Sequence, residues 1–470
     1  MCGMVPYVDF ADSKGPLLWL IYGVGYLISH HSFIGVFWIN IPFLTITLFA
    51  AYKLCCLFAN KDVSAVSTAA LPFFLYFFFI HAEVRPEDFC YPFIMLALYC
   101  TCRILKYRDS DARTYFKLSV LMGVCSMCCV LIKYNIGCMI MGLMAVVLYM
   151  AIRHKAGWLS FLGMVIGFVV PAVPFVICFL IYGNMGAFVQ EYFINTFVTT
   201  DIKGQWGIST KKMLENIFLT VFLLIILLEI ILFSRKNKLG YWLVPCYLLF
   251  IVGLGDLGKT QNYYFAIFMP FTLFIIMNVI IIVLNKNIKL RSHIKLLCCL
   301  MAMISIISEL AYIYVIRIPK DASISRQNYY KAAYVMAQIK KPTFLLYDVV
   351  DCGVGVPANN LPACRYWLLQ MGATEEMKKI REECISKRKP DFIIVGTPIK
   401  DKNDYERKKK ICNRFESLGY IFYCYAPAAF GKNGNSEAIS LYGRPGLKLP
   451  PEDFHVSQWD VWLKRNIFGI

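Results

Sequence analysis

Residues 158–183 read WLSFLGMVIGFVVPAVPFVICFLIYG and contain no charged side chain. A helix of this length can cross the ~30 Å hydrocarbon core of a bilayer. Similar apolar runs recur through the first two thirds of the chain, so we predict an all-α polytopic membrane protein with about ten spans. The predicted spans are 34–58, 66–82, 88–105, 116–132, 134–152, 158–183, 213–234, 240–256, 262–284 and 294–317.

The composition supports this class and argues against a nucleic-acid-binding protein. Of the 470 residues, 59% are hydrophobic and only 17% are charged, which is too little charge to cover a soluble surface. The net charge is +18, but the basic residues cluster in connectors on every second loop and accompany no nucleic-acid motif. This bias marks the cytoplasmic side of a multi-pass protein of the cytoplasmic (inner) membrane. The basic connectors are 103–117, 153–155, 235–238 and 286–295.

Three segments are expected along the chain. Residues 1–33 are predicted to form an outer loop and a short juxtamembrane helix, and residues 34–317 the transmembrane bundle. Residues 318–470 are more polar and are predicted to form a small extracytoplasmic α/β soluble domain. Its expected elements are strands at 343–348 and 391–396 and a polar helix at 375–388.

The first polar cluster lies almost at the N-terminus, where Asp9, Asp12 and Lys14 precede a very apolar chain. Charges at the lip of a membrane domain are costly to desolvate and are often kept for binding or chemistry. A carboxylate here could act as a general base or hold a metal ion, and the ammonium could neutralise a phosphate. The alternative is a solvated turn at the start of a helix.

The second cluster is a short connector that contains Glu83, Arg85, Glu87 and Asp88. Glu87 and Asp88 fall in the first turn of the next predicted helix, where the helix dipole favours negative charge. Capping explains one of these acids, but it does not explain Glu83 and Arg85 as well. We therefore keep both a structural and a functional interpretation of this connector.

The third cluster is Lys133-Tyr134-Asn135, between two closely spaced spans. The lysine could extend to the membrane interface, or it could face an anionic headgroup. The alternation of basic loops puts all three clusters on the outer side of the membrane. Carboxylates and lysines above a wide apolar bundle suit a lipid-phosphate substrate. No histidine or cysteine spacing indicates a metal site, and no cofactor is indicated, although a divalent cation stays open.

Three motifs in these clusters resemble one family. The segment 5–18, with Lys14-Gly15-Pro16-Leu17, is similar to the first outer loop of polytopic glycosyltransferases of the C-type fold (GT-C). These include protein mannosyltransferases and the aminoarabinose transferase of lipid A, which has a Lys-Pro-Pro-Leu motif there. The segments 87–93 and 131–135 resemble a Glu-Glu-aromatic-x-x-Pro-Phe pattern and a Lys-x-Asn pattern of the same superfamily.

The resemblance implies a membrane enzyme that transfers a sugar, a hexose or a pentose, from a polyprenyl-phosphate donor. The acceptor would be an envelope glycan, lipid or protein on the outer face. It also implies the roles of the clustered residues. The expected catalytic residues are Asp9, Asp12, Glu87 and Asp88, the expected phosphate-binding residues are Lys14, Lys133 and Arg85, and Glu83 and Asn135 are expected in the pocket.

The sequence departs from the family at its start. Members begin with a span that leads into an acidic motif with the usual catalytic base, and this chain begins after both positions. We therefore expect the first transmembrane helix to be missing, which would leave the enzyme inactive if the base is lost. Two other functions stay open, an envelope polysaccharide polymerase or ligase and a lipid-linked glycan transporter or flippase. Transporters usually place polar residues near the bilayer midplane, unlike the clusters seen here.

Overall fold

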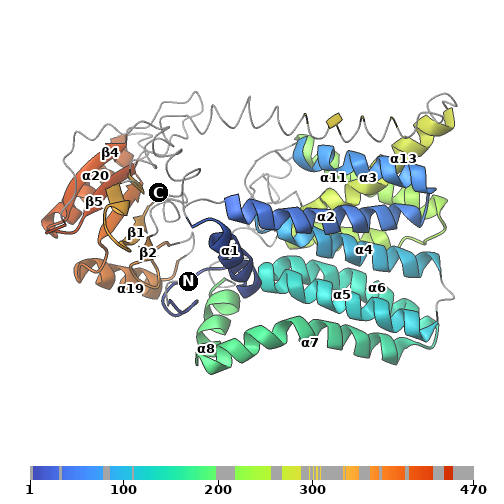
Figure 1. Ribbon diagram of the computed structural model, residues 1–470, viewed down its shortest axis with the longest axis horizontal. Coiled ribbons are helices and arrows are strands. Elements are labelled where there is room, and N and C mark those ends of the chain that lie inside the picture. Colours follow the sequence, from blue (N-terminus) through green and yellow to red (C-terminus); the bar gives the residue numbers. More distant parts are fainter. Residues whose placement is uncertain are drawn as a thin grey trace.

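The computed structural model has a helical bundle at one end and a small sheet domain at the other, with the N-terminal loop and α1 between them (Figure 1). The structure describes residues 4–30, 34–77, 85–107, 111–196, 217–255, 267–286, 296, 300, 303–304, 307, 332–333, 335–348, 360–369, 373–396, 402–426 and 439–447.

The bundle confirms the prediction of a polytopic helical membrane protein. In the part of the chain that the structure describes, five helical segments are long and apolar enough to cross a membrane. The tenth predicted span, 294–317, lies mostly outside the described residues. The helices are α1 (Pro16–Ile28), α2 (Ile34–Cys56), α3 (Lys61–Phe77), α4 (Tyr91–Lys106), α5 (Ala112–Ile132), α6 (Tyr134–Arg153), α7 (Gly157–Ile181), α8 (Met185–Phe188), α11 (Ile217–Lys236), α12 (Leu243–Gly255) and α13 (Met269–Lys286).

Small residues allow α7 to lie close against α5. A Cβ atom on Gly167 would lie 2.0 Å from the Val120 carbonyl oxygen, so only glycine fits there. The hydroxyl groups of Ser119 and Ser160 form a hydrogen bond of 2.6 Å across the same contact. Close backbone approach through small residues is a common way for helices to associate in a membrane, where burial from water offers little driving force.

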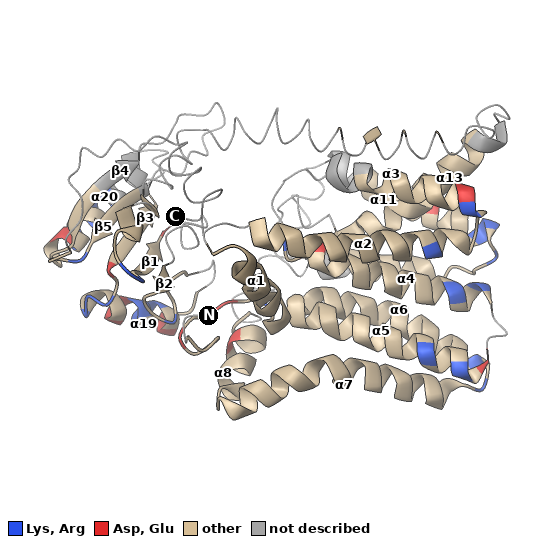
Figure 2. Ribbon diagram, in the orientation of Figure 1, with Lys and Arg blue, Asp and Glu red and all other residues tan. Residues whose placement is uncertain are grey.

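Basic residues gather at the end of the bundle that lies far from the sheet domain (Figure 2). The last turns of α2, α4, α6 and α11 all carry lysine or arginine. The N-terminal loop, η1 (a 3-10 helix, Asp88–Cys90) and η2 (a π-helix, Val189–Asn195) lie at the opposite end. The bundle is therefore strongly asymmetric in charge along its length.

The C-terminal part contains a five-stranded mixed sheet in the order β2-β1-β3-β5-β4. β1 is parallel to β2 and β3, whereas β5 is antiparallel to β3 and β4. The strands and the polar helix that we predicted are present as β1, β3 and α19. The elements are β1 (Thr343–Tyr347), β2 (Leu361–Pro362), α19 (Glu375–Ser386), β3 (Phe392–Gly396), α20 (Lys402–Ser417), β4 (Ile421–Ala426) and β5 (Ile439–Gly443).

Strand β3 is the centre of this domain, since all five of its residues are buried. Phe392 and Ile394 face one hydrophobic cluster, and Ile393 and Val395 face another, as the two-residue period of a strand requires. Residues of α19 and α20 cover the second of these faces. Because β3 is buried on both faces, its residues form a continuous apolar run in the sequence and do not alternate between apolar and polar.

Candidate functional site

Tyr7 anchors the N-terminal loop to the bundle. Its side chain is almost fully buried, and its ring contacts the rings of Phe179, Phe188 and Tyr192. Burial raises the pKa of Tyr7, and the charge of Asp12 raises it further. The phenol therefore stays protonated, and it donates a hydrogen bond of 2.8 Å to the main-chain oxygen of Lys14. This hydrogen bond fixes the position of Lys14 relative to the buried Tyr7 ring.

The two loop carboxylates make different contacts. Asp9 accepts a hydrogen bond of 2.6 Å from the main-chain nitrogen of Val5, which closes a turn of the loop. Asp12 instead pairs with the ammonium of Lys14 at 3.2 Å. The Asp12 side chain is 16% exposed and that of Lys14 is 41% exposed. This ion pair is thus accessible at the lip of the bundle.

Gly15 joins the loop to the end of α5. Its main-chain nitrogen donates a hydrogen bond of 3.0 Å to the Ile132 carbonyl oxygen. A Cβ atom on Gly15 would lie 2.1 Å from the Leu131 carbonyl oxygen, so the approach requires glycine. Since Lys133 follows Ile132 directly, the structure brings the first and third predicted clusters together.

Glu87 and Lys133 form an ion pair that links the second and third predicted clusters. The Glu87 side chain is 2% exposed and that of Lys133 is 18% exposed. The second carboxylate oxygen of Glu87, Oε2, is buried and has no hydrogen-bond partner among the described residues. A buried carboxylate oxygen of this kind is an acceptor that a bound substrate could use.

Arg85, Asp88 and Asn135 lie within two residues of this pair in the sequence. Asp88 accepts a hydrogen bond of 2.9 Å from the main-chain nitrogen of Arg85, which fixes the turn before α4. Asn135 is buried at the start of α6, and its Nδ2 has no partner within the described part of the chain. Glu83 lies outside the residues that the structure describes.

Tyr22 of α1 shows that the carboxylates of two clusters converge. Burial raises the pKa of the Tyr22 phenol, and the charges of Glu87, Asp88 and Asp12 raise it further. These residues come from η1 and from the N-terminal loop, which are far apart in the sequence. The charged groups therefore surround one region at the lip of the bundle.

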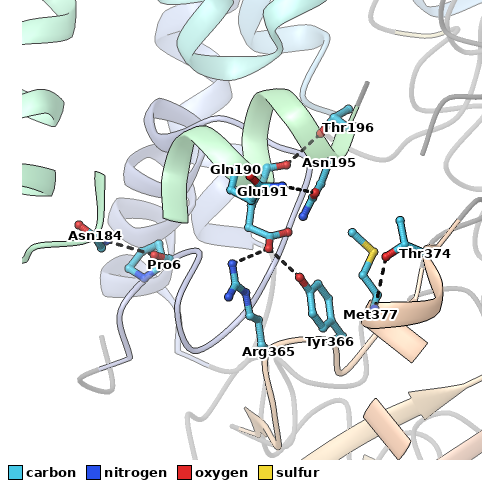
Figure 3. Close-up of polar contacts among 10 residues, drawn as sticks. All are labelled: Pro6, Asn184, Gln190, Glu191, Asn195, Thr196, Arg365, Tyr366, Thr374 and Met377. Carbon is cyan, nitrogen blue, oxygen red and sulfur yellow. Dashed lines mark hydrogen bonds and ion pairs between the residues drawn. The ribbon is translucent and has the colours of Figure 1, made fainter. Parts of the chain in front are cut away.

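A contact that the sequence did not reveal fastens the C-terminal domain to this region (Figure 3). Glu191 of η2 is 5% exposed, and its Oε1 accepts hydrogen bonds from Arg365 Nη2 at 2.5 Å and from the Tyr366 hydroxyl at 2.7 Å. Burial raises the pKa of Tyr366, and Glu191 raises it further, so this phenol stays a donor. The Arg365 carbonyl also accepts a hydrogen bond of 2.8 Å from the nitrogen of Ala11.

No spacing signal could have identified this contact, since Glu191 and Arg365 are separated by 174 positions. The sequence showed Glu191 only as one polar residue among several in a long connector. A pocket opens beside the contact, between the N-terminal loop, η2 and the C-terminal domain, and Asp12 reaches it. The pocket is lined by Ala11, Asp12, Ser13, Glu191, Asn195, Thr196, Tyr366, Leu368, Leu369, Ala373 and Met377.

The chain is a multi-pass helical membrane protein with a cluster of charged residues at one end of its bundle. Residues 13–182 match the family model of the dolichyl-phosphate-mannose-protein mannosyltransferases. This match to part of the chain supports a membrane glycosyltransferase of the mannosyltransferase type. The matched range includes Lys14, Glu87, Asp88 and Lys133. No curated protein and no solved structure matches the chain.

Proposed function

We propose that this protein transfers a sugar from a polyprenyl-phosphate donor to an envelope acceptor at the outer face of the cytoplasmic membrane. One observation carries the proposal. The hydrogen bond from Gly15 to Ile132 and the ion pair of Glu87 with Lys133 gather lysines and carboxylates above an apolar bundle. Such a bundle can accept a polyprenyl chain, and such a cluster can bind its phosphate.

Lys14 and Lys133 are the proposed donor-phosphate ligands. Lys14 is the more exposed of the two, and Lys133 is held in place by Glu87. When the bond between the sugar and the phosphate breaks, its electron pair passes to the phosphate oxygen. Ammonium groups near that oxygen stabilise the developing charge in the transition state. Arg85 is a third cation at this end of the bundle.

Asp12 is the proposed general base. It would take the proton of the acceptor hydroxyl group while the hydroxyl oxygen attacks the sugar carbon on the face opposite the phosphate. Asp12 is partly exposed, and it lies between Lys14 and the pocket, whereas Glu87 is buried in an ion pair. Asp9 and Asp88 hold turns of their own segments and are proposed to shape the site.

Asn135 is proposed to complete the donor site. Its buried Nδ2 is a hydrogen-bond donor without a described partner, and the buried Glu87 Oε2 is an acceptor without one. A sugar hydroxyl group or a phosphate oxygen could satisfy these atoms. Glu83 stays a sequence-based prediction, since it lies outside the described residues.

The proposed orientation follows from the charge asymmetry. Lysine and arginine side chains at the far end of the bundle would face the cytoplasm, as the positive-inside rule requires. The site and the C-terminal domain would then lie on the extracytoplasmic side. A polyprenyl-phosphate donor whose sugar faces outward could reach the site there.

Two substitutions test the site in proteoliposomes with a labelled polyprenyl-phosphate sugar. Lys14→Ala is expected to weaken donor binding about tenfold, because a charge-assisted contact with phosphate is lost. Asp12→Asn is expected to keep donor binding and to slow transfer by about 10²–10⁴-fold, the usual contribution of a general base. Lys61→Ala is the matched control, since Lys61 is an exposed lysine at the other end of the bundle.

Transfer at wild-type rates by both site variants would reject the assignment. The same assay separates the proposed function from transport. A flippase would leave the label on polyprenyl phosphate, because it moves the donor without breaking the bond between sugar and phosphate. Label on a new acceptor therefore supports the transferase.

A further inference from the structure

We propose that the pocket beside Asp12 is the acceptor subsite and that it takes a neutral sugar residue. This inference rests on the proposed transferase function and specifies its acceptor. Three parts of the chain form the pocket, namely the N-terminal loop, η2 with Thr196, and residues Tyr366, Leu368, Leu369, Ala373 and Met377 of the C-terminal domain. No single one of these parts would form a pocket alone.

The walls of the pocket are held together by directional contacts. Glu191 binds Arg365 and Tyr366, and Ala11 donates a main-chain hydrogen bond to Arg365. On the membrane side, Tyr192 donates a hydrogen bond to the Val130 carbonyl oxygen, which ties η2 to α5. Charged and main-chain contacts therefore fix the position of each wall of the pocket.

The lining combines the groups that a sugar ring needs. Asp12, Ser13, Asn195 and Thr196 offer carboxylate, hydroxyl and amide atoms that can bind sugar hydroxyl groups. Leu368 and Met377 offer apolar surface for the C–H face of the ring. Ligand sites commonly combine an apolar lining with a few polar groups that fix orientation.

The charges of the pocket favour a neutral acceptor over an anionic one. Two carboxylates, Asp12 and Glu191, line it. Among the described residues, the lining includes no lysine or arginine, and the nearby Arg365 is engaged with the Glu191 carboxylate at 2.5 Å. A phosphate group in the pocket would meet two negative side chains, and like charges at close range repel.

The pocket also lies where an acceptor must be. Asp12 lines it and contacts Lys14, the proposed ligand of the donor phosphate. A hydroxyl group bound in the pocket could therefore lose its proton to Asp12 and attack a donor sugar held near Lys14. One sugar–oxygen bond forms as the sugar–phosphate bond breaks, and the proton stays on Asp12.

The test uses the 470-residue chain in detergent and two tryptophan variants of it. Ala373→Trp fills the pocket from a position two residues before α19, and Ser386→Trp adds the same side chain at an exposed site at the other end of α19. The probes are neutral methyl glycosides, the corresponding sugar 6-phosphates and a short serine peptide, with binding measured by saturation-transfer NMR. Labelled polyprenyl-phosphate sugar then serves as donor in proteoliposomes.

We expect wild-type protein and Ser386→Trp to bind a neutral glycoside and Ala373→Trp to bind it about tenfold more weakly or worse. In the transfer assay Ala373→Trp should raise the acceptor KM, while donor binding stays within about twofold of wild type. Equal binding by both variants would overturn the pocket assignment, and preferential binding of the 6-phosphates, or of a serine peptide, would overturn the acceptor class. Glycoside binding that Ala373→Trp abolishes, without any transfer by wild type, would refute the proposed function but not the sugar site.

Discussion

Gly15 shows at the scale of one residue how the site depends on close packing. The resemblance to the aminoarabinose transferase places proline at this position, whereas this chain has glycine between Lys14 and Pro16. The φ angle of Gly15 is −79°, which any residue can adopt, so glycine is needed for space and not for backbone freedom. The space is occupied by the Leu131 carbonyl group.

Replacing Gly15 by alanine should therefore damage both stability and donor binding. The added methyl group would meet backbone atoms of Leu131, which cannot move without shifting α5. We expect a loss of about 1–3 kcal/mol in the free energy of unfolding, the usual cost of overpacking, and weaker donor binding. Thermal unfolding of the purified protein and a donor-binding assay measure the two effects.

Gly186→Ala is the control for this variant, because an added Cβ atom at Gly186 in α8 meets nothing within 4 Å. It should unfold close to the wild-type temperature and bind donor normally. If Gly15→Ala behaved in the same way, Lys14 would not depend on the contact with α5.

At the scale of elements, η2 connects the bundle to the C-terminal domain. A π-helical turn is rare and is often found at functional positions. This one presents Glu191, almost fully buried, to Arg365 and Tyr366. The link between the membrane part and the sheet domain therefore includes a buried, charge-assisted contact.

A double-mutant cycle tests this contact. Glu191→Gln and Arg365→Met should each destabilise the protein by about 2–3 kcal/mol, because each leaves the other charge without its partner. The double variant should lose less stability than the sum of the losses in the two single variants, as expected for residues in direct contact. Thermal unfolding measures the stability that each variant loses, and the acceptor KM reports whether the pocket is disrupted.

The exposed pair of Lys378 and Glu375 is the matched control on α19. Lys378→Met should change stability by less than about 0.5 kcal/mol, as is usual for surface ion pairs. Additive effects of Glu191→Gln and Arg365→Met would show that the two residues do not hold the domains together.

At the scale of the whole molecule, the charge asymmetry predicts how the protein sits in the membrane. The turn at Lys155 joins α6 to α7 at the basic end, and the turn at Arg388 joins α19 to β3 in the C-terminal domain. Both residues are exposed, so short insertions should be tolerated there. We expect an epitope after Arg388 to bind antibody on intact spheroplasts and an epitope after Lys155 to bind only after permeabilisation. The reverse pattern would invert the proposed orientation.

Much of this architecture could be predicted from the sequence, because it rests on local patterns. Apolar length predicts the membrane helices, and apolar runs bounded by turns predict β1 and β3. The clusters around Lys14, Glu87 and Lys133 could be found because charged residues are rare in this chain and costly at the lip of a bundle. Their roles as site residues stay predictions.

The docking of the C-terminal domain could not be predicted in this way. Arg365 and Tyr366 follow a strand of only two residues, and neither stands out in a polar segment. Their partner Glu191 lies in a connector whose composition is ordinary. Contacts between residues so far apart arise from the folded arrangement of the elements, and a single sequence carries no periodic signal for them.

The pocket is lined by residues that are far apart in the sequence. On the proposed assignment, the codons for residues 12–133 govern how the sugar is activated, and those for residues 360–377 govern which molecule receives it. Substitutions at pocket residues such as Leu368 and Ala373, rather than at Arg365 and Tyr366, could change the acceptor without altering the donor residues. A descendant of this protein could thus transfer the sugar to a different molecule while it keeps the same donor.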